Sequence, residues 1–169
     1  MGSCNIEVRR AVPDDAEEIE KVARATWRTA YAEIILPEHQ ERLLCRWYAP
    51  DALRESIAQE ASWFYVAQAD DRLVAFAQFV IHDDGRGQLT RIYVMPDWQR
   101  QKIGSLLLQT GLAALGGRNV REVFVEVEKN NRVGRAFYEG KGFRYECEFG
   151  IELGEQDLIL QQLALPVHN

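Results

Sequence analysis

The chain has 169 residues, of which 47% are apolar and 27% charged, as is typical of one globular domain over residues 1–169. Its net charge of −6 argues against the broad basic face that binding of nucleic acid requires. No apolar run approaches the roughly 18 to 20 residues that span a bilayer, so we expect a cytoplasmic protein that does not contact membranes.

Basic residues gather in two segments of this acidic chain. Residues 91–121 hold five basic residues against one acidic residue, and residues 128–144 hold five against two. This distribution predicts a small polyanionic ligand held locally, and acidic surface elsewhere that attracts a cationic partner. The three cysteines, Cys4, Cys45 and Cys147, are odd in number and far apart, which argues against a disulfide framework and against a thiolate metal site.

The first half of the chain predicts a strand, three helices and two more strands. Asp14 is the expected cap of the first helix, with Glu17 three residues later as in a capping box. Prolines open the two shorter helices, and β-branched and aromatic residues fill the strands. The expected elements are a strand at 6–11, helices at 12–31, 37–48 and 50–60, and strands at 63–68 and 73–82.

The second half alternates strands with helices and ends in a hairpin. Its expected elements are a strand at 88–94, a helix that begins near Gly104, a strand at 122–128, a helix at 131–141, and paired strands at 143–153 and 156–165. A mixed sheet with helices on both faces follows, which is an α/β fold.

Common nucleotide and nucleophile motifs do not fit this sequence. The segment GRAFYEGK has five residues between Gly134 and Gly140 where a Walker loop has four, and GRGQLT places Thr90 at the third glycine position of the dinucleotide fingerprint. The histidines are scattered, and no G-x-S-x-G elbow offers a serine nucleophile. Metal chemistry and acyl-enzyme chemistry are therefore both unsupported.

The junction QRQKIGS, residues 99–105, lies between an expected strand and an expected helix. A turn that feeds a helix presents unpaired N–H groups at the positive end of the helix dipole, an arrangement that suits a phosphate or pyrophosphate. Arg100 and Lys102 add positive charge, Gly104 permits close approach of the backbone, and Ser105 offers a hydroxyl donor. A solvated helix start is the alternative interpretation of the same stretch.

The stretch IYVMPDWQRQKIGSLLL, with VFVEVEKNNRVGRAFYEGKGF further along, resembles the signature region of the GNAT superfamily of N-acetyltransferases. The likeness covers residues 72–145 closely, although Lys102 stands where a glycine is common and Leu106 where Gly or Ala is preferred. It implies a mainly antiparallel sheet of about seven strands, acetyl-CoA as the acyl donor and no metal. The cofactor-binding residues that it implies are Ile92, Tyr93, Val94, Arg100, Gln101, Lys102, Ile103, Gly104, Ser105, Asn131 and Tyr138.

Two residues are candidates for the chemistry of acetyl transfer. Tyr138, which the resemblance implies as the acid for the departing thiolate, lies two turns from the expected helix cap Asn131 on nearly the same helix face. Val133, Ala136 and Phe137 are the expected core stripe of that helix, and a core role for Tyr138 is the alternative. Strand alternation places Glu126 opposite the valines of its strand, and the resemblance implies a general base there. The alternative for Glu126 is a solvated carboxylate at a strand edge.

The sequence predicts the amine acceptor less specifically than it predicts the acyl donor. Trp27 and Tyr31 lie one helical turn apart, in the region with which the superfamily usually lines its acceptor cleft. A position in the core is the alternative for both residues. The acidic remainder of the chain favours the primary amine of a small cationic molecule, and residues 26–44 weakly resemble the polyamine-acetylating branch. A protein N-terminal or lysine acetyltransferase, and a non-catalytic acyl-CoA-binding module, are the alternatives. The oligomeric state stays open, a homodimer included.

Overall fold

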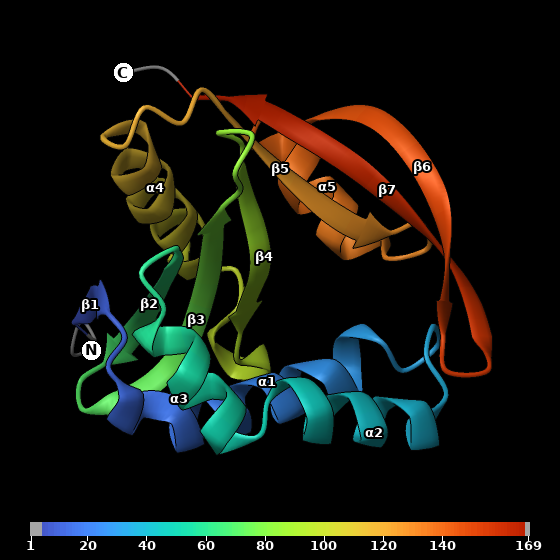
Figure 1. The fold of residues 1–169 in the computed structure, drawn as a ribbon. Helices are drawn as coiled ribbons and strands as arrows, with labels where there is room; N and C mark the ends of the chain where they lie inside the picture. Colours follow the sequence, from blue (N-terminus) through green and yellow to red (C-terminus); the bar gives the residue numbers. More distant parts are fainter. Residues whose placement is uncertain (1–4, 168–169) are drawn as a thin grey trace.

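A computed structural model describes residues 5–167, so Cys4 lies outside the described residues. In this part of the chain, one sheet holds seven strands in the order β1-β2-β3-β4-β5-β7-β6 (Figure 1). The strands are β1 Ile6–Arg10, β2 Ser62–Ala69, β3 Arg72–Ile81, β4 Gly87–Val94, β5 Glu122–Glu128, β6 Arg144–Leu153 and β7 Gln156–Pro166. The helices are α1 Ala16–Ala30, α2 Pro37–Trp47, α3 Pro50–Ala58, α4 Ile103–Gly116 and α5 Arg132–Gly140.

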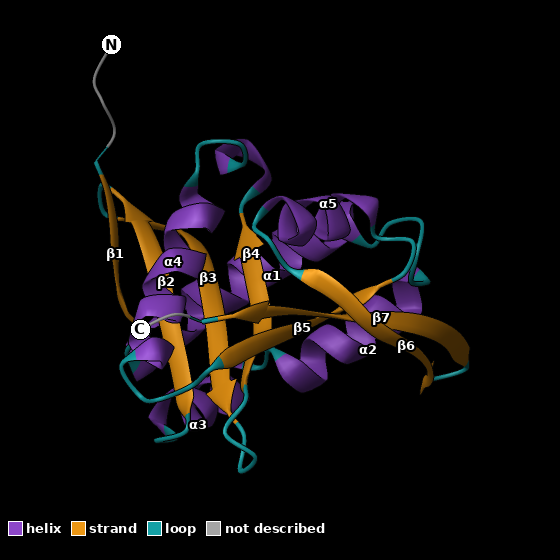
Figure 2. Ribbon diagram, turned by 90° about the horizontal axis from the view of Figure 1, so that it is seen from above, coloured by secondary structure: helices purple, strands orange, loops and turns teal. Residues whose placement is uncertain are grey.

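The pairing is antiparallel everywhere except between β4 and β5, which run parallel because α4 forms the crossover between them. These two strands pair only at Gly87 with Val123 and at Gln88 with Phe124. Beyond those positions they diverge, so that β5, β7 and β6 run away from the plane of β1–β4 (Figure 2). The expected mixed, mainly antiparallel seven-stranded α/β fold is confirmed.

Helices cover both faces of the sheet, and each face has its own apolar core. One core joins α4 and the aromatic residues of α5 to the sheet, and it takes in the alternating valines Val123, Val125 and Val127 of β5. The other core joins α1, α2 and α3 to the opposite face around Phe64 and Phe76. Glu126 therefore lies on the side of β5 that faces α1 and α2, as strand alternation predicts.

Strand β4 contains a β-bulge that was not predicted from the sequence. Leu89 pairs with Phe79 and Arg91 pairs with Gln78, so Thr90 is the extra residue. The buried Gln78 side chain, which lies opposite Arg91, donates to the hydroxyls of Ser56 and Ser62 and so occupies a polar position on the α3 side of the sheet.

Two local expectations were wrong. Asp15, not Asp14, accepts a hydrogen bond from the Val12 N–H at 2.8 Å, and Arg9 holds the Asp15 carboxylate in an ion pair. The pKa of Asp15 is lowered, because the hydrogen bonds from Arg9 and Val12 outweigh the effect of its burial. In α5, the expected core stripe is exposed at Val133 and Ala136, whereas Phe137 and Tyr138 pack against the core.

In the described part of the chain, no helix has both the length and the apolar character needed to cross a bilayer.

The close approach of α4 to the sheet depends on Gly111. A Cβ atom at this position would lie 2.1 Å from the ring of Phe79, which is fully buried. Gly111→Ala should therefore lower the free energy of unfolding by about 1–3 kcal/mol, despite the better helix propensity of alanine. Gly140→Ala is the matched control because a Cβ there meets nothing within 4 Å, and it should leave the thermal midpoint unchanged or slightly raised. Equal midpoints for the two variants would contradict this account.

Candidate active site

Strand β4 connects two pockets on the surface of the protein. Its central residues Thr90, Arg91 and Tyr93 line a cleft between the α1–α2 layer and the diverging strands. Beyond its last residue, Val94, the chain passes through a short loop to the first turn of α4, which lines the second pocket. The divergence of β4 from β5 therefore leaves one continuous strand exposed between two binding surfaces.

The loop before α4 has the backbone conformation of an anion-binding nest. Arg100 and Lys102 both have φ of +64°, in the left-handed region that non-glycine residues rarely adopt. The first backbone bond of the helix runs from the Leu106 N–H to the Lys102 carbonyl, so the preceding N–H groups, from Ile103 to Ser105, point out of the helix start. Such a curl at the positive end of a helix dipole suits a phosphate group.

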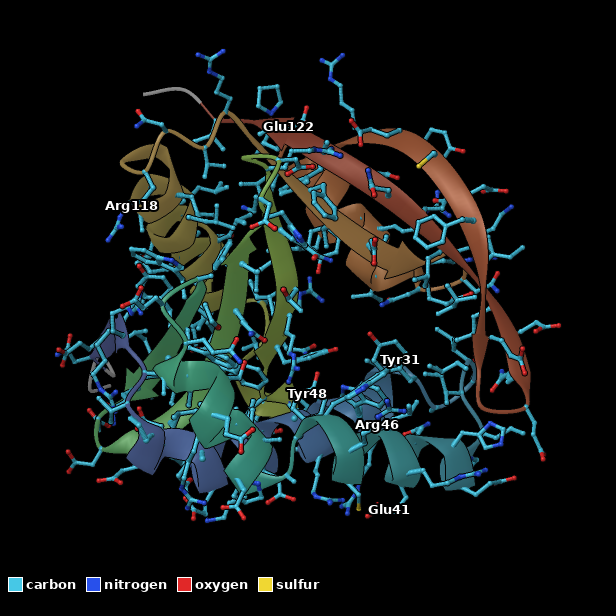
Figure 3. The ribbon with its side chains drawn as sticks, in the orientation of Figure 1. Tyr31, Glu41, Arg46, Tyr48, Arg118 and Glu122 are labelled. Atoms are coloured by element: carbon cyan, nitrogen blue, oxygen red, sulfur yellow. The ribbon has the colours of Figure 1, made fainter. Side chains whose placement is uncertain are left out.

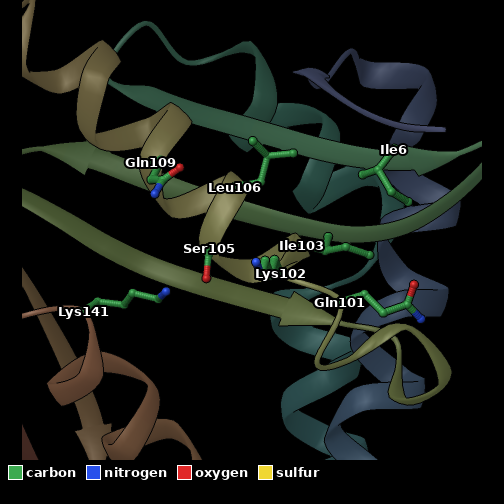
Figure 4. A pocket seen from close by; sticks show the side chains of 8 residues that line it. All are labelled: Ile6, Gln101, Lys102, Ile103, Ser105, Leu106, Gln109 and Lys141. Atoms are coloured by element: carbon green, nitrogen blue, oxygen red, sulfur yellow. The ribbon is translucent and has the colours of Figure 1, made fainter. Parts of the chain in front are cut away.

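The pocket beside this loop has a volume of about 520 Å³. Lys102 and Ser105 lie on one side of it, and Lys141, which follows α5, reaches toward Ser105 from the other (Figure 4). Two lysines, a hydroxyl and the helix start together fit a pyrophosphate, the polyanionic group of coenzyme A. Lys141 was not singled out from the sequence, although the basic segment 128–144 contains it.

Packing alone does not require a glycine at position 104. A Cβ atom here would meet the Phe137 ring at 3.5 Å and the Val94 Cγ2 atom at 3.7 Å, which are ordinary contacts. The residue therefore faces α5 and the end of β4. Among the other expected cofactor residues, Ile92, Tyr93 and Val94 pair on one side with β3, and β5 pairs with none of them on the other. Their open edge is free for an extended ligand.

Asn131 caps α5, as its sequence position predicts. Its Oδ1 atom accepts from the Gly134 N–H at 2.9 Å. A Cβ atom at residue 134 would lie 2.8 Å from the Asn131 amide nitrogen, so glycine makes room for the cap. This cap fixes the start of the helix that carries Tyr138.

Tyr138 packs edge-on against Phe137 and Phe143, with ring centroids 5.4 and 5.7 Å away. Burial raises the pKa of its phenol well above the usual range, so the hydroxyl keeps its proton at physiological pH. Burial also raises the pKa of Tyr31 and of Tyr93, and the nearby Tyr138 phenol adds to both shifts.

The cleft on the α1–α2 side has a volume of about 280 Å³. The hydroxyls of Tyr31 and Tyr93 lie 3.4 Å apart within it, and Figure 3 shows Tyr31 projecting from α1 toward the diverging strands. Trp27 contributes to the floor but is itself only 3% exposed. Tyr48 was missed from the sequence, together with Trp47, Arg91 and Glu128, because segments far apart in the chain bring these residues together.

Two carboxylates lie on the β5 wall of this cleft. Glu128 is buried and accepts hydrogen bonds from the backbone and side chain of Asn130 at 2.6 and 3.2 Å. Glu126 is open to solvent on the cleft side and has no such partner among the described residues. Partial desolvation raises the pKa of Glu126, an effect that the His82 ring partly offsets. Glu126 is the carboxylate here that is free to exchange a proton with a ligand.

The fold, the nest and the cleft together define an acyltransferase that uses coenzyme A. A model described as Acetyltransferase (GNAT) family matches residues 19–143, and the chain belongs to this family. It is 30% identical to a spermidine N(1)-acetyltransferase of Thermoplasma acidophilum, over 84% of this chain and 90% of that one. It is also 34% identical to a [ribosomal protein bS18]-alanine N-acetyltransferase of Salmonella typhimurium, over 59% and 68% of the two chains.

A solved structure supports the same assignment. The crystal structure of PaiA N-acetyltransferase from Thermoplasma acidophilum in complex with coenzyme A superimposes with a TM-score of 0.82 at 28% identity, covering 93% of this chain and 98% of that one. The protein is therefore an acetyl-CoA-dependent N-acetyltransferase, which confirms the expected enzyme class and acyl donor. The alternative interpretation, a non-catalytic acyl-CoA-binding module, is therefore not supported.

The Lys102→Gly variant removes one positive charge from the nest but keeps its backbone conformation. Glycine adopts a positive φ without strain, so the melting temperature should stay level or rise slightly. The lost cation should weaken coenzyme A binding about tenfold, as measured by calorimetry. Lys21→Gln, an equal charge change on α1, should leave affinity unchanged. Unaltered affinity in Lys102→Gly would remove this loop from the phosphate site.

Tyr138→Phe removes the phenol oxygen and keeps the packed ring. If the hydroxyl stabilises the departing thiolate, kcat should fall by about 10² or more, while coenzyme A affinity and melting temperature stay nearly constant. Tyr145→Phe, at a position that is 57% exposed on β6, is the matched control. Parallel losses of affinity and stability in Tyr138→Phe would instead assign Tyr138 to packing alone.

Proposed function

We propose that the enzyme acetylates the primary amine of a small cationic, polyamine-like molecule, with donor and acceptor bound together on the two sides of β4. The observation that carries this proposal is the makeup of the acceptor cleft. Its floor holds three tyrosines, Tyr31, Tyr48 and Tyr93, and its β5 wall holds Glu126 and Glu128. Aromatic faces and carboxylates are the groups that attract an organic cation.

The one basic side chain among the described cleft residues is already engaged. The Arg91 guanidinium lies 4.6 Å from the centre of the Tyr48 ring and donates to the Trp47 carbonyl at 3.0 Å. Its charge is thereby directed toward the protein rather than toward the space beside Glu126. The likeness to a spermidine acetyltransferase points to the same acceptor class.

The residues of the cleft and Tyr138, which lies outside it, divide the chemistry between them. When bound, acetyl-CoA supplies an acetyl group activated as a thioester. Glu126 accepts a proton from the incoming ammonium, directly or through water, which frees the amine lone pair for attack. The Tyr31 and Tyr93 hydroxyls hold the polar end of the acceptor. Tyr138, which keeps its phenol proton, donates a hydrogen bond to the sulfur as the C–S bond breaks, and the proton that the acylated nitrogen loses passes to that sulfur, so that coenzyme A departs as a thiol.

A peptide N-terminus is the second candidate acceptor, because of the likeness to a ribosomal-protein alanine acetyltransferase. The two candidates differ in acid–base behaviour. An α-amino group has a pKa of about 8, whereas an alkylamine has a pKa of about 10 and is almost fully protonated at neutral pH. A polyamine therefore depends more strongly on a base in the cleft.

Glu126→Gln tests the base and the acceptor together. With spermidine, kcat/KM of the wild type should rise with pH, because both the carboxylate and the free amine accumulate as protons are lost. In Glu126→Gln, kcat/KM should be at least tenfold lower than in the wild type and should rise less steeply with pH, whereas the affinity for coenzyme A should not change. The assay measures free thiol released with spermidine, an aminoglycoside and short peptides at several pH values.

The control for this experiment is Glu148→Gln, which removes the same charge on β6 beside Lys129 and Gln161. It should leave the pH profile intact. If Glu126→Gln raises only KM, and added salt weakens acceptor binding in the wild type, then Glu126 attracts the cation without acting as the base. Faster turnover of peptides than of every small amine would overturn the proposed acceptor.

A further inference from the structure

The turn between β6 and β7 lies against the loop between α1 and α2, at the end of the molecule farthest from β1 (Figure 1). These segments are more than a hundred residues apart in the chain, and each contributes to the acceptor cleft. Tyr31 and Ile35 come from the loop, whereas Ile151, Leu153 and Leu158 come from the hairpin. Contacts between the two segments therefore determine whether this end of the cleft is open or closed.

Among the residues that the structure describes, Gln156 has the one side chain that links these segments by hydrogen bonds. Its Nε2 atom donates to the Ile34 carbonyl at 2.6 Å, and its Oε1 atom accepts from the Leu36 N–H at 3.4 Å. The amide thus pairs with backbone groups on both sides of Ile35, much as a neighbouring strand would. Ile35 between them is 5% exposed.

The same loop is held from its other side by Gln40. The Gln40 amide is buried and donates to the carbonyls of Tyr31 and Ile35 at 2.9 and 2.8 Å. The loop is therefore kept in one conformation by two glutamines, one from α2 and one from the hairpin. Of the two, Gln156 is the one that joins the walls of the cleft, because Gln40 belongs to the same wall as the loop.

We propose that Gln156 is a specificity-determining residue that closes the far end of the acceptor cleft and so limits the length of the acceptor chain. This inference rests on the proposed function, because it concerns how far a small amine extends past its reacting nitrogen. The side chains at the closed end are aliphatic, so they favour a short methylene segment and disfavour a second charged group there. An acceptor that is long enough to extend past this end requires that the two hydrogen bonds of the Gln156 side chain break.

The test is a length series of primary amines. Diamines from 1,3-diaminopropane to 1,8-diaminooctane, then spermidine and spermine, are assayed by thiol release. In the wild type, kcat/KM should decline beyond a certain chain length. Gln156→Ala should raise kcat/KM for the longest amines relative to the shortest by about tenfold, mainly through KM, because about two modest hydrogen bonds no longer have to break. Coenzyme A affinity should not change.

Two further variants control for indirect effects. Gln161→Ala removes an amide on the same strand that bonds to Glu148 on the surface, and its length profile should match the wild type. Gln156→Glu keeps the side-chain length but cannot donate to the Ile34 carbonyl, so it should reproduce the change in selectivity even if Gln156→Ala folds poorly. Hydrogen exchange at residues 34–36 should accelerate in both Gln156 variants, which is a readout independent of turnover.

The outcomes distinguish this inference from the proposed function. A wild-type enzyme that acetylates the amines, combined with unchanged length profiles in both Gln156 variants, overturns the role of Gln156 and leaves the proposed function standing. A wild type that ignores the whole amine series but acetylates peptides overturns the proposed function. In that case the same variants are compared on peptides of two to eight residues, and equal use of all lengths by the wild type overturns the closed end.

Discussion

The divergence of two neighbouring parallel strands is the constraint on which the rest of the site depends. Because β4 and β5 pair at only two positions, the backbone of β4 beyond Gln88 has one open edge in the middle of the sheet. Unpaired peptide groups are costly when they are buried, so this edge is maintained only because it faces a ligand or solvent. The same divergence leads Val94 toward the nest on one side and turns Glu126 toward the cleft on the other.

Helix α5 packs on the same face of the sheet as α4, and few of its side chains reach the core. No residue of α5 is fully buried, and Val133 is 80% exposed. Phe137 and Tyr138 supply most of the apolar attachment, while Asn131 and Gly134 define where the helix begins. Tyr138 therefore combines packing with the hydrogen-bond donation that we assign to it. Because no residue of α5 is fully buried, the position of the Tyr138 ring depends on its aromatic neighbours Phe137 and Phe143.

Most of the fold could be predicted from the sequence because its elements have strong local signals. Hydrophobic alternation identified β5 and the face of Glu126, and prolines marked the starts of α2 and α3. The junction before α4 was predicted to present free N–H groups, since Arg100 and Lys102 lie two residues apart just before a helix start, and its role in phosphate binding stays a prediction. Local patterns do not carry long-range geometry, however. Tyr48, Arg91 and Lys141 reach the two pockets only through the folded topology, and no periodicity in the sequence links them.

The helix-cap and helix-face errors have a similar origin. Asp14 and Asp15 are equivalent by residue type, and the ion pair with Arg9 on a different element decides between them. The faces of α5 were assigned as if the helix lay flat on a sheet, whereas Phe137 and Tyr138 are the side chains of α5 that pack against the core. In each case, a contact distant in sequence overrides the local preference.

The extra residue Thr90 inverts the orientation of every side chain that follows it in β4. Leu89 faces the core beneath α4, and in a regular strand Arg91 and Tyr93 would face the same core. The bulge instead places Tyr93 among the aromatic rings on the α1 side, and it directs Ile92 and Val94 toward α4. If Thr90 were instead accommodated as a regular residue of the strand, without the bulge, the two sets would exchange: Tyr93 would face the apolar core beneath α4, and Ile92 and Val94 would face the cleft. The polarity of the acceptor cleft therefore depends on the position of one extra residue in β4, as well as on the chemistry of the side chains.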